Sequence, residues 1–323
     1  MLAIQALQAG GPEVLWPVDI PVPAPGPGEV LIRHKAIGLN FIDTYQRSGL
    51  YPVSYPAILG GEAAGIVEAV GEGVTRFSLG DRAAYGTGVA GAYAEAQVAP
   101  EGRCVRVPDD VSLETPAAAL LKGMTAEFLL RRCHPLAAGE TVLIHAAAGG
   151  VGQILTQWAK AIGATVIATA GGADKLALAK DLGADHGVDY RTEDVAARVR
   201  EITAGRGVRV VYDGVGAATF DGSLGSLAPR GLMVSYGNAS GPAPPFAPLK
   251  LMAAGSVYIT RPTLLHYVST TEELDQSAAA LFDVIRSGKV EITVGQTFAL
   301  KDAAKAHEAL EQRLTTGSTL LIP

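Results

Sequence analysis

A short turn of small residues is the part of this chain with the clearest chemistry. Residues 146–152 read AAAGGVG; a β-branched and apolar run at 141–145 precedes them, and apolar residues at helical spacing follow over 151–162. In a strand-turn-helix unit, small residues let the backbone approach a pyrophosphate, and the first N–H groups of the helix bind its charge. The order of elements favours a dinucleotide site over a plain structural turn. The positions of the G-x-G-x-x-G pattern fall on Ala147, Gly149 and Gly152, with alanine in the first place.

The end of the next predicted strand, 165–170, indicates which dinucleotide would bind. An enzyme that prefers NAD usually has Asp or Glu there, about 20 residues beyond the turn, to bind the ribose hydroxyls. Residues 168–172 read ATAGG, so no carboxylate of this strand would repel a 2′-phosphate, and Lys175 follows in the first turn of a predicted helix. On its own, such a lysine is usually a solvated surface residue. We expect NADPH as the cofactor, with Gly171 and Lys175 near its 2′-phosphate.

The elements that must position this turn divide the chain by texture. Up to about residue 120 the chain consists of short predicted strands, broken by Gly- and Pro-rich turns, which indicates a compact β-rich unit. These strands are predicted at 2–8, 14–20, 30–36, 64–70, 82–85 and 92–98.

After about residue 120, strands and helices alternate, which is typical of a doubly wound parallel sheet with helices on its faces. The strands are predicted at 141–145, 165–170, 186–189, 208–213, 232–236 and 257–260. The helices are predicted at 151–162, 173–182, 193–203, 217–227 and 246–253. In the tail, a long helix, a second helix and a last strand are expected, marked by Leu274, Ala278, Leu281 and Ile285 on one face, by Lys301 and by 319–322.

Several residues around the turn stand at the spacing of a known family signature. They are Gly139, Glu140, Leu143, Ala147, Ala148, Gly149, Gly150, Gly152, Gln157 and Lys160. In these residues the sequence resembles the quinone oxidoreductase and zeta-crystallin family, a zinc-free branch of the medium-chain dehydrogenase/reductase superfamily. The resemblance covers essentially the whole chain, through runs at 10–15, 40–43, 211–213 and 317–318. It implies an α/β fold, with a GroES-like β-rich catalytic domain (1–120), an inserted Rossmann domain (121–260) and a return segment that completes the first domain (261–323).

The resemblance also implies which residues contact NADPH. In the glycine turn they are Ala147, Ala148, Gly149, Gly150, Val151 and Gly152. Tyr190 and Arg313 match a tyrosine and an arginine that join the lysine at the 2′-phosphate in relatives. The positions that line the nicotinamide ribose and carboxamide in relatives match Met124, Thr125, Tyr236, Gly237 and Asn238.

No metal ion is expected. By resemblance, Asn40 stands where zinc-dependent relatives have a cysteine ligand, and Gly61 stands where they have a histidine. Cys104 and Cys133 have no ligand partners at zinc-like spacing, and the four-cysteine lobe of a structural zinc is absent. Reduction of a simple carbonyl needs a Lewis acid or a good proton donor, whereas a quinone that accepts a hydride becomes an aromatic product. A zinc-free site of this fold is therefore expected to favour quinones or conjugated enones.

Three side chains are the catalytic candidates around the nicotinamide, namely Asn40, Tyr45 and Tyr51. Asn40 replaces a metal ligand, and the stretch 40–45 resembles the active-site helix of the family. Structural interpretations stay open for all three. Asn40 can cap that helix, with Asp43 three residues on, and the tyrosines can be packing residues.

Two further polar residues flank the predicted Rossmann strands. His145 precedes the glycine turn on an apolar strand, so a hydrogen-bonded core histidine is expected rather than a catalyst. Arg261 follows the last of these strands and could point to the substrate or lie on the surface.

Together these features predict an NADPH-dependent, zinc-free enzyme that reduces a quinone in the cleft between its domains. The electrons would leave nicotinamide C4 as a hydride or one at a time. Two alternatives stay open. One is a reductase of α,β-unsaturated aldehydes or ketones, and the other is a nucleotide-regulated RNA-binding or crystallin-like structural protein, as the resemblance also allows.

The composition limits the partners of this chain. With 26 Lys and Arg against 32 Asp and Glu, its net charge of -6 gives no electrostatic reason to expect a nucleic-acid partner. The two cysteines are too few for a disulfide framework, and neither a signal peptide nor a membrane span is recognisable, so a cytoplasmic protein is expected. The apolar run 256–260 could be an exposed edge strand, which predicts a homodimer.

Overall fold

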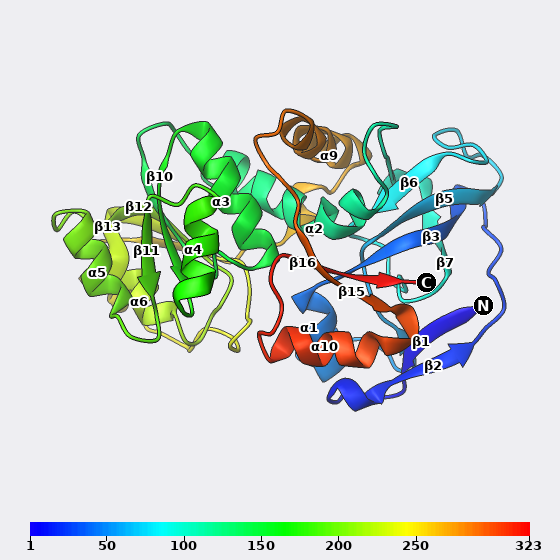
Figure 1. Cartoon of the computed structure of the whole chain (residues 1–323), viewed down its shortest axis with the longest axis horizontal. Coiled ribbons are helices and arrows are strands. Elements are labelled where there is room, and N and C mark those ends of the chain that lie inside the picture. Colours follow the sequence, from blue (N-terminus) through cyan, green and yellow to red (C-terminus); the bar gives the residue numbers. More distant parts are fainter. The chain divides into compact units, whose positions relative to one another are not determined.

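The computed structural model describes residues 1–323 and divides into two compact units (Figure 1). Unit 1 consists of residues 1–124, 267–286 and 292–323. Unit 2 consists of residues 125–266 and 287–291. No helix is both long enough and apolar enough to cross a membrane.

Unit 1 is built on two β-sheets. The larger sheet has the strand order β15-β16-β3-β5-β6-β8, and β7 also pairs with β3; the smaller one has the order β2-β1-β4. Except for the parallel pair β15 and β16, the paired strands are antiparallel. The strands are β1 (Leu2–Ala6), β2 (Leu15–Asp19), β3 (Glu29–Leu39), β4 (Ala57–Ile58), β5 (Ala63–Val70), β6 (Arg82–Tyr85), β7 (Ala96–Pro100), β8 (Val105–Arg106), β15 (Val294–Ala299) and β16 (Ser318–Ile322).

The helices of unit 1 include α1 (Phe41–Ser48), which follows the longest strand of the sheet directly. The others are α9 (Thr271–Arg286), α10 (Ala303–Glu311) and the short 3-10 turns η1 (Pro12–Val14), η2 (Glu101–Arg103) and η4 (Leu300–Asp302). Helix α2 (Glu114–Phe128) runs from unit 1 into unit 2, and α8 (Leu264–Tyr267) runs back. The core combines aliphatic side chains of the sheet with Tyr85, Tyr93 and residues of α10.

Unit 2 is the expected doubly wound parallel sheet. Its strand order is β11-β10-β9-β12-β13-β14, with every pair parallel. The strands are β9 (Thr141–Ile144), β10 (Thr165–Ala170), β11 (His186–Asp189), β12 (Val208–Asp213), β13 (Leu227–Ser235) and β14 (Tyr258–Thr260). The helices are α3 (Gly150–Ile162), α4 (Ala173–Asp181), α5 (Val195–Ile202), α6 (Phe220–Ser226), α7 (Leu249–Ala253) and a π-helical turn η3 (Leu129–Cys133).

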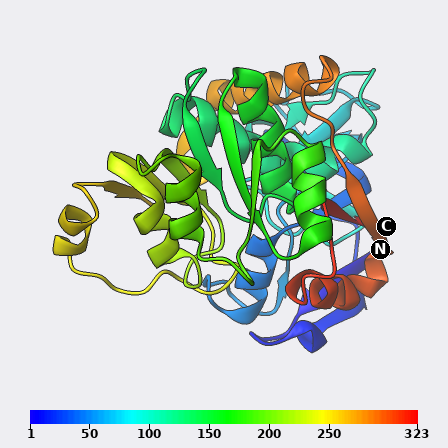
Figure 2. The same cartoon turned by 60° about the vertical axis from the view of Figure 1, so that its left-hand side comes forward.

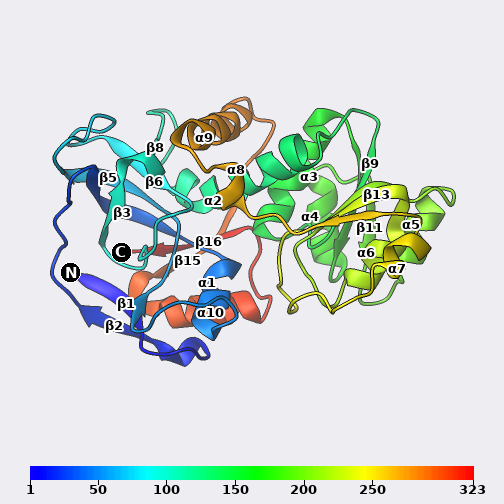
Figure 3. The same cartoon turned by 180° about the vertical axis from the view of Figure 1, so that it is seen from behind.

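The sheet of unit 2 is buried on both faces, as a parallel sheet requires. Leu143 and Ile167 belong to one hydrophobic cluster with Val199 of α5 and Phe220 of α6. Neighbouring residues of a strand point to opposite faces of the sheet. The residues next to Leu143 and Ile167 in their strands are equally buried and line the other face, where α3 and α4 contact β9, β10 and β11. Figures 1 and 3 show this unit from opposite sides, and Figure 2 shows α7 (yellow) at its margin.

A short segment from the tail, residues 287–291, also packs in unit 2. The Gln157 side chain on α3 donates a hydrogen bond to the Glu291 carbonyl oxygen (3.0 Å) and accepts one from the Glu291 N–H (2.8 Å). The Lys160 ammonium, one turn further on, bonds the Asp185 carboxylate. Gln157 and Lys160, two residues of the family signature, therefore each connect α3 to another segment of unit 2.

Most predicted elements of unit 2 are confirmed, and their ends differ by a few residues. The strands at 165–170, 186–189 and 208–213 have the predicted bounds, whereas β13 begins at Leu227 rather than at 232. Helices α5, α6 and α7 are shorter than predicted. In unit 1 the strand predicted at 92–98 is found at Ala96–Pro100, and the long tail helix and the final strand are confirmed.

Candidate functional site

The glycine turn lies between β9 and α3, as predicted. A Cβ atom on Gly152 would lie 2.3 Å from the Ala146 carbonyl oxygen and 2.8 Å from Ala147 Cα, so only glycine fits there. Ala146 has a φ of 50°, a left-handed conformation that is uncommon for alanine and tightens the turn. The first hydrogen bond of the helix runs from the Gln153 N–H to the Gly149 carbonyl (2.9 Å). The N–H groups of residues 150–152 thus have no partner within the helix and form a site for an anion.

A buried polar network supports this turn from within the sheet. His145 is fully buried; its Nδ1 lies 3.0 Å from Thr169 Oγ1 and its Nε2 lies 2.9 Å from Ser223 Oγ. Ser223 donates its own proton to the Asp213 carboxylate (2.6 Å), so it accepts the Nε2–H of a neutral His145. Burial also lowers the pKa of His145, which keeps the ring neutral. The expectation of a core histidine is confirmed.

The end of β10 is covered by side chains from the loop after β11. A Cβ atom on Gly171 would lie 2.6 Å from the Tyr190 hydroxyl, and one on Gly172 would lie 2.0 Å from Arg191 Nη2. Lys175 lies in the first turn of α4, which starts directly after these glycines. The structure therefore brings three of the predicted residues, Gly171, Lys175 and Tyr190, to one place. It adds Arg191, which the sequence analysis did not single out, although a basic residue just after a predicted parallel strand is a usable signal.

A third loop lies at the same edge of the sheet. Tyr236 donates its backbone N–H to the Asp213 carbonyl (2.8 Å), and a Cβ atom on Gly237 would lie 2.3 Å from the Gly214 carbonyl oxygen. Asn238 follows and is half-buried. Because the carboxyl ends of parallel strands meet at one edge, the loops after β9, β10, β12 and β13 are neighbours there. Arg313 belongs to unit 1, in the turn after α10, with a φ of 60°.

In unit 1, Asn40 is the residue before α1 and is held from two sides. Its side-chain N–H donates to Glu62 Oε2 (2.8 Å), and its backbone N–H donates to Asp43 Oδ2 (2.9 Å). The capping interaction with Asp43 is therefore confirmed. Glu62 is fully buried and also accepts hydrogen bonds from the Lys122 ammonium (3.1 Å) and from the Leu121 N–H (2.6 Å).

A second buried chain of polar groups extends from Asp43. Tyr93 donates its hydroxyl proton to Asp43 (2.9 Å) and lies 2.9 Å from His307 Nε2. Arg47 lies 3.2 Å from His307 Nδ1 and forms an ion pair with Glu311 (2.8 Å). Burial raises the pKa of Asp43 to about 7, while burial and the neighbouring Arg47 lower that of His307 to about 3. No local pattern predicts these pairs, because the partners of Tyr93 lie 50 and 214 residues away along the chain.

The two candidate tyrosines lie together beside α1. The ring centroids of Tyr45 and Tyr51 are 5.3 Å apart and their planes are tilted by 59°, and the Tyr45 ring also contacts Phe41. Tyr51 donates its backbone N–H to the Tyr45 carbonyl (3.0 Å). The two rings thus form one aromatic cluster that starts five residues after Asn40.

The remaining predicted positions are placed as follows. Met124 and Thr125 are buried in α2. Arg261 donates a hydrogen bond to the Pro262 carbonyl. Cys104 is buried, which raises its pKa to about 12, and Cys133 is half-buried. No three of the His, Cys, Asp and Glu side chains are grouped so that they could hold a metal ion.

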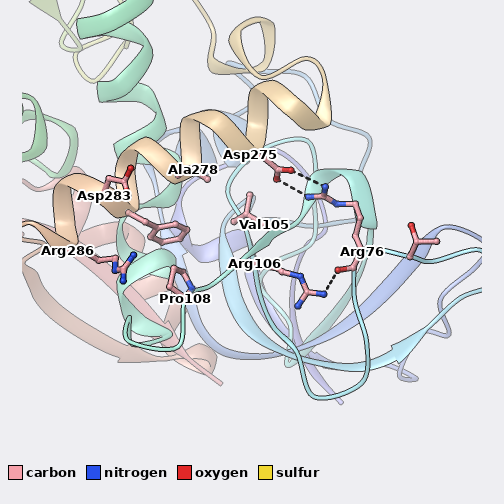
Figure 4. Close-up of a pocket in the computed structure, with 11 residues that line it drawn as sticks. Arg76, Val105, Arg106, Pro108, Asp275, Ala278, Asp283 and Arg286 are labelled. Atoms are coloured by element: carbon pink, nitrogen blue, oxygen red, sulfur yellow. Dashed lines mark hydrogen bonds and ion pairs between the residues drawn. The ribbon is translucent and has the colours of Figure 1, made fainter.

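A cavity of about 590 Å³ lies elsewhere in unit 1, between β8 and α9 (Figure 4). Its rim carries arginines that are already paired: Arg76 makes two hydrogen bonds to Asp275 (2.8 and 3.0 Å), and Arg286 bonds Asp110 (2.8 Å). None of the predicted site residues lines it. It is therefore not a candidate for the site described above.

Comparison with known proteins gives a consistent result. Residues 26–109 match the model of the alcohol dehydrogenase GroES-like domain, and residues 150–282 match that of the zinc-binding dehydrogenases. The chain is 52% identical to a quinone oxidoreductase of Pseudomonas aeruginosa over 99% of both chains, and 44% identical to a 2-haloacrylate reductase of a Burkholderia species over 97% of this chain and 96% of that protein. The crystal structure of Escherichia coli quinone oxidoreductase complexed with NADPH is similar over the full length of both chains, with a TM-score of 0.98 and 47% identity.

Proposed function

The chain belongs to the quinone oxidoreductase family of the medium-chain dehydrogenases/reductases, and we propose that it reduces quinones with NADPH and without a metal ion. The observation that carries this proposal is the turn between β9 and α3, where a Cβ atom on Gly152 would collide with the backbone of Ala146. Such a turn leaves room for a pyrophosphate next to the first N–H groups of α3.

NADPH fits the residues that surround the turn. Residues 147–152 would hold the pyrophosphate. Lys175 on α4 and Tyr190 in the loop after β11 would bind the 2′-phosphate, and by resemblance to the family Arg313 would do so as well. Met124, Thr125 and the loop 236–238 would line the nicotinamide half. The solved Escherichia coli relative was crystallised with NADPH, which supports this choice of cofactor. When bound, NADPH supplies reducing electrons from nicotinamide C4.

Zinc does not fit the residues of unit 1. The position of the first expected ligand is Asn40, whose amide is bound to the buried Glu62, and the position of the second is Gly61, which has no side chain. The residues present therefore give a metal ion no part in the reaction. A quinone needs less acid catalysis than a simple carbonyl because its reduction product is aromatic, so the site chiefly has to place the acceptor.

The residues around α1 would perform this placement. We infer that Asn40 donates a hydrogen bond from its side-chain amide to a quinone oxygen and that the Tyr45 and Tyr51 rings contact the flat face of the quinone. Glu62 and Lys122 act as positioning residues, because their hydrogen bonds fix the carboxamide of Asn40. Turnover of an Asn40→Ala variant tests this role. A loss of more than about threefold in a variant that stays folded supports it, and a smaller loss leaves Asn40 only its capping role.

The overall proposal is tested by the oxidation of NADPH and NADH by the purified, metal-chelated protein with 1,4-benzoquinone. We expect turnover with NADPH preferred. Tight NADPH binding without turnover on quinones would contradict quinone as the substrate and would leave NADPH as the cofactor.

The 44% identity to a 2-haloacrylate reductase favours a second candidate, the reduction of conjugated enones. A hydride from the same donor would then add to one carbon of the double bond next to a carbonyl group, and the other carbon would take a proton from water. Saturating rates on a small quinone and on an enone of similar size decide between the two. A faster enone reaction would reverse the order of our candidates.

We also propose that the chain forms a homodimer through β14. This strand is at the edge of the sheet of unit 2, and its first residue, Tyr258, is 63% exposed. Two apolar side chains of the preceding helix α7 are also exposed, Leu249 (67%) and Met252 (62%). An edge strand with such neighbours is suited to pairing with a second copy. Light scattering at micromolar concentration is expected to give the mass of a dimer, and Tyr258→Lys is expected to give a monomer. A monomeric wild-type protein would refute this proposal.

A further inference from the structure

The carboxylate of Asp189 links the loop after β11 to the end of β10. It accepts hydrogen bonds from the backbone N–H of Arg191 (3.0 Å) and from its side-chain Nε (3.3 Å) and Nη2 (3.4 Å). The backbone N–H of Gly172 also bonds this carboxylate, and together these donors lower the pKa of Asp189. Asp189 is therefore ionised and held next to the first residues after β10.

The guanidinium of Arg191 lies directly on Gly172. A Cβ atom there would be 2.0 Å from Nη2 and 2.8 Å from Cζ, so the contact depends on a bare backbone. The Arg191 side chain is 58% exposed, against 17% for Asp189. One side of the guanidinium thus covers the carboxylate, and the other is open to a ligand.

The position of this pair is where dinucleotide enzymes distinguish NADH from NADPH. A carboxylate at the end of the second strand binds the ribose hydroxyls of NADH and repels a 2′-phosphate. Here β10 itself has none, but Asp189 pairs with Ala170, the last residue of β10, across the sheet. The neighbouring strand therefore brings a carboxylate to this place, and Arg191 neutralises it.

We propose that Arg191 is a specificity-determining residue for NADPH, which presents its guanidinium to the 2′-phosphate and masks the Asp189 carboxylate. This inference rests on the proposed cofactor. Guanidinium groups bind phosphate oxygens through paired N–H donors, and an arginine near this strand end is a known way to accommodate a 2′-phosphate.

The test measures the affinities for NADPH and NADH by titration calorimetry without quinone, and takes their ratio. Arg191→Ala is expected to lower the NADPH to NADH ratio at least tenfold, because it removes a cation and unmasks Asp189. Adding Asp189→Asn to that variant is expected to raise the NADPH to NADH affinity ratio again, by at least threefold. Exposed ion pairs contribute little to stability, so the Tm of each variant is expected to stay unchanged.

Arg198→Ala is the matched control, since Arg198 is also exposed and paired with acidic residues, but on α5. Its ratio should equal that of the wild type. An unchanged affinity ratio in Arg191→Ala, which includes equal losses of NADPH and NADH affinity, would overturn the inference. The proposed cofactor would be unaffected, because the wild type would still bind NADPH. A double variant no better than Arg191→Ala would overturn the masking of Asp189. A wild-type protein that does not prefer NADPH would instead refute the proposed cofactor.

Discussion

At the residue scale, two backbone positions in the glycine turn have different requirements. Ala147, in the first position of the pattern, is fully buried and its methyl group has a place. Gly152, in the last position, cannot carry a Cβ atom, because the Ala146 carbonyl would be 2.3 Å away. The departure from the glycine pattern therefore falls where the fold tolerates a side chain.

This difference gives a prediction for Gly152→Ala. We expect NADPH affinity to fall at least tenfold, or ~1.4 kcal/mol, because the start of α3 must move away from the turn. Calorimetric titration of NADPH measures it. Gly222→Ala on α6 is the matched control, since its nearest neighbour would be Val195 Cβ at 3.8 Å, and it should bind like the wild type. Wild-type affinity in Gly152→Ala would show that the turn does not define the nucleotide site.

The same scale shows which contacts were predictable. Asp43 is three residues from Asn40, so the capping interaction was visible as a local pattern. The other partner of Asn40, Glu62, is 22 residues away, and Lys122 is 60 residues beyond that. No local pattern joins such residues, although a single lysine within the apolar segment 117–130 was a signal that a buried partner exists.

At the scale of elements, Glu62 joins three parts of unit 1. It directly precedes β5. Its carboxylate accepts hydrogen bonds from Asn40 at the start of α1 and from Leu121 and Lys122 of α2. The Glu62 carboxylate also packs closely against β3, since a Cβ atom on Gly38 of that strand would lie 2.2 Å from Glu62 Oε2. The buried ion pair thus fixes the direction in which α1 leaves β3.

Lys122→Met is expected to destabilise unit 1 by ~3 kcal/mol, because it leaves the buried Glu62 charge without its cation. The double variant Glu62→Gln/Lys122→Met should regain most of the loss, since no buried charge remains. Thermal unfolding of the wild type and both variants measures this. Equal Tm values for the single and the double variant would contradict the role of the unpaired charge.

The elements also differ in how well a sequence reveals them. The strands of unit 2 are short apolar runs between glycine-rich turns, and most were predicted to within a residue or two. Helix α2 was not predicted, because nearly all of its faces are buried and it has no polar stripe to give a helical period. Strand β13 was predicted too short, because Pro229 and Gly231 interrupt its apolar pattern.

At the scale of the whole molecule, buried ionisable groups make stability depend on pH. Burial lowers the pKa of His34 to about 4 and that of His307 to about 3, and it also lowers that of His145. Below about pH 6.5 the unfolded chain binds protons that the folded histidines do not, so stability is lost as the pH falls. Asp43, with its raised pKa of about 7, acts in the opposite sense over the same range.

Three groups against one predict a Tm that decreases from pH 7 to pH 4.5. Asp43→Asn removes the opposing group, so its Tm should decrease more steeply than that of the wild type. Thermal unfolding at intervals of half a pH unit compares the two. A wild-type Tm that stays level or increases on acidification would contradict the assignment of neutral buried histidines.

The two hydrogen bonds between the Gln157 side chain and the Glu291 backbone have a consequence for exchanging nucleotide-binding units between relatives. A graft of residues 125–266 alone would remove both hydrogen bonds between the Gln157 amide and the Glu291 backbone and leave that amide only the Gln153 carbonyl, at a cost of roughly 0.5–1.5 kcal/mol for each hydrogen bond lost. The segment 287–291 would have to travel with it. Chimeras with both pieces from one parent should therefore be more stable than chimeras that mix them.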